Sequence, residues 1–295
     1  MRVTDTMIFD NASRYSGEAS SRMAAATEVA SSGLRVMHPG DDPSASGLIS
    51  SHHQAQKRAE AIGQVAGRAS DELGAADGAL GAVSTALAQA RQLAVQFAND
   101  SYNASDRAAA AGTMKSLIGE VIASLNSKVG DRYLFGGSKD NQPPFDSAGG
   151  YQGDALVRQI EVAPGVLQDV SVRADVAISG AGGGTDVLAT LQGLATALST
   201  NNLAGIQSSI DGLTQSTNQV SAARATAGGA LSALDAAQAV ASAAANTEKT
   251  AASHLEDADV IDSATRLQLA QRALEASLQA SAQSFQLSLL GQKLQ

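Results

Sequence analysis

The chain has 295 residues and a formal net charge of −9, from 29 acidic and 20 basic residues. This balance argues against nucleic-acid binding, and the absence of cysteine excludes disulfides and thiolate metal clusters. Alanine provides 59 residues and only nine are aromatic, so the composition suits thin, closely packed helices rather than a wide core of large side chains.

The N-terminal segment predicts an amphipathic helix. One face of residues 8–30 gathers apolar and small side chains, of which we take the following as a candidate assembly surface: Ile8, Ala12, Tyr15, Ala19 and Met23. The first residues are of mixed polarity and lack the apolar core of a cleaved secretory signal. No segment approaches the roughly 20 apolar residues of a membrane span. If the protein is exported, we therefore expect a route without a cleaved signal.

Two long heptad seams follow, in the stretches 44–142 and 165–295 that contain no proline. All thirteen positions of the first seam are apolar: Ala55, Ala59, Ile62, Ala66, Ala69, Leu73, Ala76, Leu80, Val83, Leu87, Ala90, Ala94 and Phe97. The second seam covers residues 206–245 and is apolar except at Thr217, Arg224 and Gln238. Because the two seams have similar lengths, we expect their helices to pair.

Five glycines line the flank of the first seam: Gly63, Gly67, Gly74, Gly78 and Gly81. In an exposed helix each costs about 1 kcal/mol relative to alanine. We interpret this glycine stripe as a surface for close packing of a second helix, within the bundle or between copies. The alternative is that tertiary contacts simply tolerate these glycines.

The middle of the chain predicts two shorter helices and a β insert. One helix should cover residues 106–129, with Ser105 as its N-cap and Gly130 as its stop, and the other residues 186–198. Residues 156–162 and 170–178 alternate and are rich in valine and isoleucine, which is typical of strands. We expect the glycine-rich run 180–184 to be a flexible segment at the end of the β insert.

The C-terminal segment predicts a second amphipathic helix. Its stripe supplies the remaining candidate assembly residues: Leu267, Leu274, Leu278, Phe285 and Leu289. The acidic residues between 256 and 262 lack calcium-loop spacing and suit the start of this helix through its dipole. Isolated amphipathic helices are marginal in water, so we expect both terminal helices to become ordered on copies of the chain or on a relative.

Candidate chemistry is sparse. The four histidines show no HExxH motif or i,i+4 pair, and we expect them on solvated helix surfaces rather than on a metal. The glycine-rich run precedes no phosphate-binding signature, and the serine-hydrolase motifs GxSxG and SxxK are absent. We therefore expect no cofactor and no enzymatic activity.

These patterns predict a mainly α fold: a long coiled-coil-like helical rod built from both chain halves, with a small β insert domain in the middle. We expect three domains. The terminal helices, residues 1–44 and 255–295, form an assembly domain; residues 45–140 and 185–254 form the helical rod; and residues 141–184 form the β insert.

Three stretches of the chain resemble the bacterial flagellin family. They are SSGLRVMHPGDDP at 31–43, GDRYLFGG at 130–137 with PPF at 143–145 and YQGD at 151–154, and ATRLQLAQRALEAS at 264–277 with QLSLL at 286–290. The second group is similar to the hook-associated proteins at the hook–filament junction rather than to filament flagellin. The resemblance covers both ends and the entry to the middle. HPG before the two aspartates departs from the family pattern, and residues 291–295 extend past its usual end.

The resemblance implies a structural protein of the flagellum that forms a ring between hook and filament. It implies an extracellular location, reached through the flagellar type III channel with a cytoplasmic export chaperone. The implied partners are copies of the chain, the first hook-associated protein and flagellin.

Three alternatives remain open at this point. A short filament flagellin is the nearest, although RYLFGG and PPF argue against it. A chemoreceptor-like signalling rod would also be alanine-rich with heptads, but would have no β insert and would normally carry a membrane span. A cell-wall hydrolase would need paired carboxylates in a cleft, and the β insert is small for one.

Overall fold

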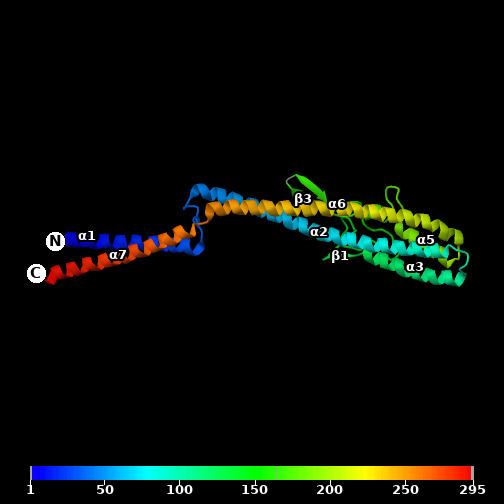
Figure 1. Ribbon diagram of the computed structural model, residues 1–295, viewed down its shortest axis with the longest axis horizontal. Coiled ribbons are helices and arrows are strands. Elements are labelled where there is room, and N and C mark those ends of the chain that lie inside the picture. Colours follow the sequence, from blue (N-terminus) through cyan, green and yellow to red (C-terminus); the bar gives the residue numbers. More distant parts are fainter. Residues whose placement is uncertain (1, 164, 294–295) are drawn as a thin grey trace. The chain divides into compact units, whose positions relative to one another are not determined.

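The computed structural model describes residues 2–163 and 165–293, with side chains at residue 7 and at residues 9–163 and 165–283. It is mainly helical, as predicted (Figure 1). Its long helices are α1 (Arg2–Ser32), α2 (Pro43–Phe97), α3 (Ala104–Leu125), α5 (Val187–Ser199), α6 (Leu203–Glu256) and α7 (Val260–Lys293), and α4 (Ala174–Ala177) is a single turn.

The contacts divide the chain into two compact units. Unit 1 contains the residues up to Arg58 and those from Ala244 onward, and unit 2 contains Ala59–Ala243. The long helices α2 and α6 each contribute to both units. The three-domain division made from the sequence stays a prediction.

Unit 2 contains the large apolar core, and the heptad seams supply much of it. Every position of the first seam from Ala66 to Phe97 is buried. In the second seam the aliphatic residues Ile206, Leu213 and Val220 are fully buried. Helices α3 and α5 pack against each other and complete the core with large side chains, among them Met114, Leu125, Leu191, Leu194 and Leu198.

Helix α5 was predicted well, whereas the predicted ends of α3 were wrong. The N-cap of α5 is Asp186, whose side chain accepts from the Ala189 backbone N–H. The N-cap of α3 is Asn103 rather than Ser105, and it forms a capping box with Asp106. Helix α3 ends at Leu125, so Gly130 does not stop it. Instead Gly130 has φ of 60° in the turn between β1 (Lys128–Val129) and β2 (Arg132–Tyr133).

The β structure is smaller than the sequence predicted. Strands β3 (Gln159–Ala163) and β4 (Val166–Asp169) form an antiparallel hairpin, and residues 170–178 are not a strand. In that segment the buried apolar residues Val170, Ala174, Ala177 and Ile178 follow helical rather than alternating spacing, because the chain turns through α4 to reach the core.

The glycine-rich run 180–184 forms a hydrogen-bonded turn, and its flexibility stays a prediction. Gly180, Gly182 and Gly183 have positive φ, and the Gly184 N–H donates to the Gly180 carbonyl. A Cβ at Gly184 would lie 2.4 Å from Oε1 of Gln219. Gln219 accepts from the Thr185 N–H and so attaches this turn to α6.

In unit 1, α1 and α7 pack against each other in antiparallel orientation (Figure 1). The sequence pattern did not predict that these two helices pair with each other. Their facing residues are small or of medium size, and only Ala19 and Ser263 are buried among the described side chains of the two helices. Each helix therefore leaves most of its circumference exposed.

Candidate assembly interface

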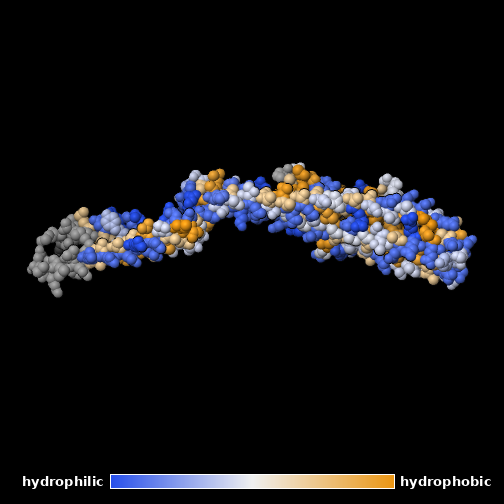
Figure 2. All heavy atoms as spheres, viewed as in Figure 1, coloured by the Kyte–Doolittle hydropathy of each residue, from blue (hydrophilic) through white to orange (hydrophobic). Residues whose placement is uncertain are grey.

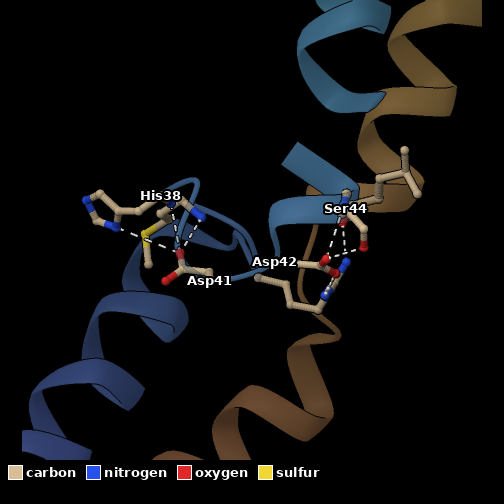
Figure 3. A network of polar contacts seen from close by, with 8 residues as sticks. His38, Asp41, Asp42 and Ser44 are labelled. Atoms are coloured by element: carbon tan, nitrogen blue, oxygen red, sulfur yellow. Dashed lines mark hydrogen bonds and ion pairs between the residues drawn. The ribbon is translucent and has the colours of Figure 1, made fainter. Parts of the chain in front are cut away.

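A short turn between α1 and α2 sets the direction of the chain in unit 1 (Figure 3). Asp42 caps α2: its Oδ1 accepts from the Ser44 hydroxyl at 2.7 Å and from the Ala45 N–H at 3.1 Å. Its other oxygen accepts from Arg35 at 3.2 Å. The hydrogen bonds from Ser44, Ala45 and Arg35 lower the pKa of Asp42 to about 2.

The neighbouring Asp41 stabilises the same turn through hydrogen bonds to the turn's own backbone. Its Oδ2 accepts from the backbone N–H of His38 at 2.8 Å and of Met37 at 3.0 Å, and these two hydrogen bonds lower the pKa of its carboxyl (Figure 3). The two aspartates of the HPGDDP motif thus have separate roles, because one folds the turn and the other starts the next helix.

Backbone hydrogen bonds join this turn to the start of α7. The Arg35 N–H donates to the Glu256 carbonyl at 2.6 Å, and the Ala258 N–H donates to the Gly33 carbonyl at 2.8 Å. The Arg35 guanidinium adds a bond to the Leu255 carbonyl at 2.6 Å. Gly33 has φ of 72°, which favours glycine there. This joint, residues 33–45 with 255–259, fixes where α1 ends and where α7 begins.

The acidic run acts at a helix start, as predicted. Asp259 Oδ1 accepts from the Ile261 N–H at 2.7 Å and from the Asp262 N–H at 3.1 Å, which caps α7. Asp262 pairs with Arg266 one turn later, at 2.8 Å. Ser253 donates to Asp257.

The structure places the predicted assembly residues in two environments. Ala12, Met23, Leu267 and Leu274 are half-buried and Ala19 is buried, on the faces that α1 and α7 turn toward each other. Tyr15 is 57% exposed and Leu278 is 53% exposed. The side chains of Ile8, Phe285 and Leu289 lie outside the residues whose side chains the structure describes. The predicted stripes therefore combine an internal seam with an exposed surface.

The sequence analysis did not include several residues of this pair. Val29 is half-buried, while Val260 and Ile261 at the start of α7 are 77% and 79% exposed. Leu269 is 59% exposed beside a groove of about 630 Å³ that alanines of α1 and α7 line. Along the coloured part of the two helices, hydrophilic and apolar residues are mixed (Figure 2). Val260, Ile261 and Leu269 therefore join the candidate assembly residues of α7.

The glycine stripe of α2 also falls into two groups. A Cβ at Gly63, Gly67 or Gly81 would lie 3.3–3.7 Å from residues of α6, whereas Gly74 and Gly78 have no described atom that close. Gly67 lies against Gln238, and Gly81 lies against Arg224. Both of these α6 residues are polar exceptions in the second seam. The role of the whole stripe in packing stays a prediction.

Arg224 also forms an ion pair between α6 and α2, because it donates to both carboxylate oxygens of Asp77, at 2.9 and 3.0 Å.

The GDRYLFGG, PPF and YQGD segments tie loops of unit 2 together. The Tyr151 hydroxyl lies 3.0 Å from the Phe135 carbonyl and 2.9 Å from the Asp154 carbonyl. Burial, with the charges of Asp175 and Asp154, raises the pKa of Tyr151 to about 12. Gly137 has φ of 68° and lies where a Cβ would meet Asp154. These residues have structural roles.

Two further features of the described residues bear on function. These residues contain no group of three or more histidine, cysteine or acidic side chains arranged to hold a metal ion. None of their helices is long and apolar enough to cross a membrane. The expectation that all histidines are simply solvated is wrong for His52 and His53, which are partly buried and contact Glu248 and Glu256.

Comparisons with known proteins point to one family. The N-terminal helical region of bacterial flagellin matches residues 3–140. A Salmonella typhimurium flagellar hook-associated protein 3 is 28% identical over 169 residues, and the match covers 55% of this chain and 53% of that relative. An Escherichia coli protein of the same name is 26% identical over 278 residues, covering 86% of this chain and 87% of the relative. The resemblance to flagellar hook-associated protein 3 of the flagellin family is confirmed.

Solved structures of hook-associated proteins share the fold. A putative flagellar hook-associated protein from Vibrio parahaemolyticus has a TM-score of 0.68 and 21% identity, covering 74% of this chain and 100% of that one. Xanthomonas campestris FlgL has a TM-score of 0.61 and 20% identity, covering 68% and 99%. The flagellin match, residues 3–140, includes nearly all of α1, the 33–45 turn and α2, so the α1 part of the candidate assembly surface lies inside it.

Proposed function

We propose that this chain is a structural subunit of the bacterial flagellum at the junction between hook and filament, and that it assembles through α1 and α7. The observation that carries the proposal is the exposed apolar surface of the α1–α7 pair on a chain related to hook-associated protein 3. An assembly surface must leave apolar residues uncovered in the monomer and bury them in the polymer. Tyr15, Leu269 and Leu278 meet the first condition.

The proposed partners follow from this role. They are copies of the chain in a ring, the first hook-associated protein on one side and flagellin on the other, with a chaperone before export. The proposed location is outside the cell, reached by flagellar type III export without a cleaved signal. The assembly domain would comprise residues 1–44 and 255–295, the helical rod 45–140 and 185–254, and the β insert 141–184. The relatives belong to a family of structural flagellar proteins, which supports a role other than catalysis.

The decisive experiment changes exposed residues of the α1–α7 pair in a strain that lacks the chromosomal copy. Tyr15→Ser, Leu269→Ser and Leu278→Ser together should leave the melting temperature of the purified chain within about 2 °C, because exposed changes cost little. They should abolish filament growth, while hooks form and flagellin monomer is secreted.

The matched control is Val240→Ser, which changes a 67% exposed residue on α6. It should support normal filaments. Normal filaments with the triple variant would refute assembly through this surface. A large fall in the monomer melting temperature would show instead that the three residues serve folding.

A further inference from the structure

The β3–β4 hairpin of unit 2 carries apolar side chains away from the core. Ile160 pairs with Gln168 and packs against the buried cluster that α2 and α6 form, whereas Leu167 pairs with Glu161. Because neighbouring residues of a strand point to opposite faces, Leu167 points away from these helices. Val166 and Leu167 are 52% and 63% exposed. Apolar residues gather over this hairpin, which projects beyond α6 (Figure 1 and Figure 2).

A groove of about 440 Å³ lies in the same unit, between α6 and the segment that follows β4. Leu73 and Ala227, both buried, line it together with Val172 and Val176. The α6 side of the groove consists largely of small residues, namely Ala222, Ala223, Thr226 and Ala230. Because an apolar cavity of roughly 150 Å³ holds a benzene molecule, this groove has room for two aliphatic side chains.

The chain does not fill this groove with its own hairpin tip. Among the residues of the hairpin, Asp169 lines the groove and Val166 and Leu167 do not. We propose that Val166 and Leu167 of one copy enter the groove of the next copy, so that unit 2 adds a head-to-tail contact to the assembled ring. This inference rests on the proposed function. A protrusion and a recess on the same chain make a heterologous contact, which closes into a ring when the rotation between copies allows it.

The charges of the two surfaces are complementary. The hairpin tip is anionic, because Glu161 lies opposite Leu167 and no described residue of the hairpin is basic. Arg173 lines the groove and donates to Asp175 from Nε at 3.2 Å and from Nη2 at 2.6 Å. Its Nη1 remains to donate to an incoming carboxylate. The α6 side carries no acidic residue over positions 212–234, so it does not repel Glu161.

The contact is too small to hold two copies together alone. A stable interface buries roughly 800 Å² on each partner, and two aliphatic side chains supply only part of that area. In a ring, the α1–α7 surfaces already hold the copies next to each other. The effective concentration of a tethered neighbour is then in about the millimolar range, at which a weak contact forms. We therefore expect this contact in assembled junctions and a monomeric chain in solution.

The test uses the absence of cysteine from the chain. A strain that lacks the chromosomal copy produces Leu167→Cys with Thr226→Cys, and its isolated hook–filament structures are treated with a short bismaleimide. The matched control is Leu167→Cys with Val240→Cys, because Val240 is also exposed on α6 but lies about 21 Å further along the helix. The first variant should give a ladder of dimers and larger products, at least roughly tenfold more than the control, because each copy contacts two neighbours.

Two further arrangements make the result decisive. Leu167→Cys and Thr226→Cys on separate, co-expressed chains cannot be linked within one chain and should give dimers. Val166→Cys with Ala222→Cys tests the same contact at a second pair of positions. The inference is overturned if filaments grow and both pairs give no more product than the control, or if the product contains another flagellar protein in place of a second copy. If the chain is absent from the isolated structures, the proposed function fails and this inference fails with it.

Discussion

The core of unit 2 and the α1–α7 pair of unit 1 use helical seams of the same kind with opposite results. In unit 2, Leu80, Leu87 and Leu191 have no exposed surface. In the α1–α7 pair, Ile261 is 79% exposed, and the buried positions among the described side chains are an alanine and a serine. The difference comes from the number of elements, because α3 and α5 cover faces of α2 and α6.

This comparison shows that a heptad seam alone does not determine whether a helix is buried. Two helices that share one seam bury only the stripe between them, and a core requires a third and fourth element with large side chains. Unit 2 has these elements within the chain. In the proposed function, neighbouring subunits provide them for the α1–α7 pair.

The largest expected effect is in the core of unit 2. Leu191→Ala should lower the free energy of unfolding by about 3 kcal/mol, because it removes a fully buried side chain and leaves a cavity. Leu278→Ala, on the exposed face of α7, should change it by less than about 0.5 kcal/mol. Urea unfolding followed by circular dichroism measures both. Similar costs for the two variants would remove the contrast between the regions.

The next largest change in the free energy of unfolding should come from a buried arginine in unit 2. Arg107 is 4% exposed and donates to the carbonyls of Phe97 and Asn99, at 3.2 and 2.9 Å, and to Asn201. Arg107→Met should cost about 2 kcal/mol, because buried acceptors are left without donors. Arg91→Met, at an exposed position of α2, is the control and should be almost neutral in the same urea titration.

Substitutions in the glycine stripe should change the stability of the monomer by a smaller amount, and should raise it rather than lower it. Gly74→Ala and Gly78→Ala should each stabilise the monomer by up to about 1 kcal/mol, since both are helical and no described atom lies where the Cβ would be. Gly67→Ala should gain less, because its Cβ would press on Gln238 at 3.3 Å. The melting temperatures of the three variants measure this order. If the stabilised variants fail to support filaments, the exposed glycines serve packing between copies.

The smallest expected effect is the acid dependence of the α2 cap. Folding lowers the pKa of Asp42 from 3.8 to about 2, so its contribution is present above about pH 4 and is lost as the pH falls toward 2. Asp42→Asn keeps a side-chain acceptor without the charge. It should flatten the loss of helical signal between pH 4 and 2. An unchanged acid titration by circular dichroism would contradict this role.

The seams, α5 and the α7 start were predictable because local patterns control them. The first seam places thirteen apolar residues at regular steps, and Asp186 and the acids near 259 mark helix starts. The segment 170–178 was not predictable in this way. Its valines and alanines alternate as in a strand, and only the position of the core shows that they are buried through a helical turn.

The assembly surface was predictable in part. The stripes identified the apolar faces of α1 and α7. They did not predict that each helix would cover part of the other's stripe. That pairing depends on the joint, where backbone atoms of Gly33 and Arg35 bind residues 256–258. Backbone hydrogen bonds between residues more than 200 positions apart leave no sequence signal. The glutamate partners of His52 and His53 were not predictable either, because these side-chain contacts join residues 196 and 203 positions apart.

The ion pair between Arg224 and Asp77 has a consequence for how α2 and α6 slide along each other. A shift of one heptad, about 10 Å along the axis, would still bring apolar seam positions together. It would place Ser70 or Ser84 opposite Arg224, since these lie seven residues from Asp77. The Arg224 guanidinium would then lose its bidentate contact with a carboxylate, which costs up to about 1 kcal/mol for side chains that are 40% and 28% exposed. This charged pair therefore favours one axial register of two helices of more than 50 residues each, together with the His52–Glu248 and His53–Glu256 contacts.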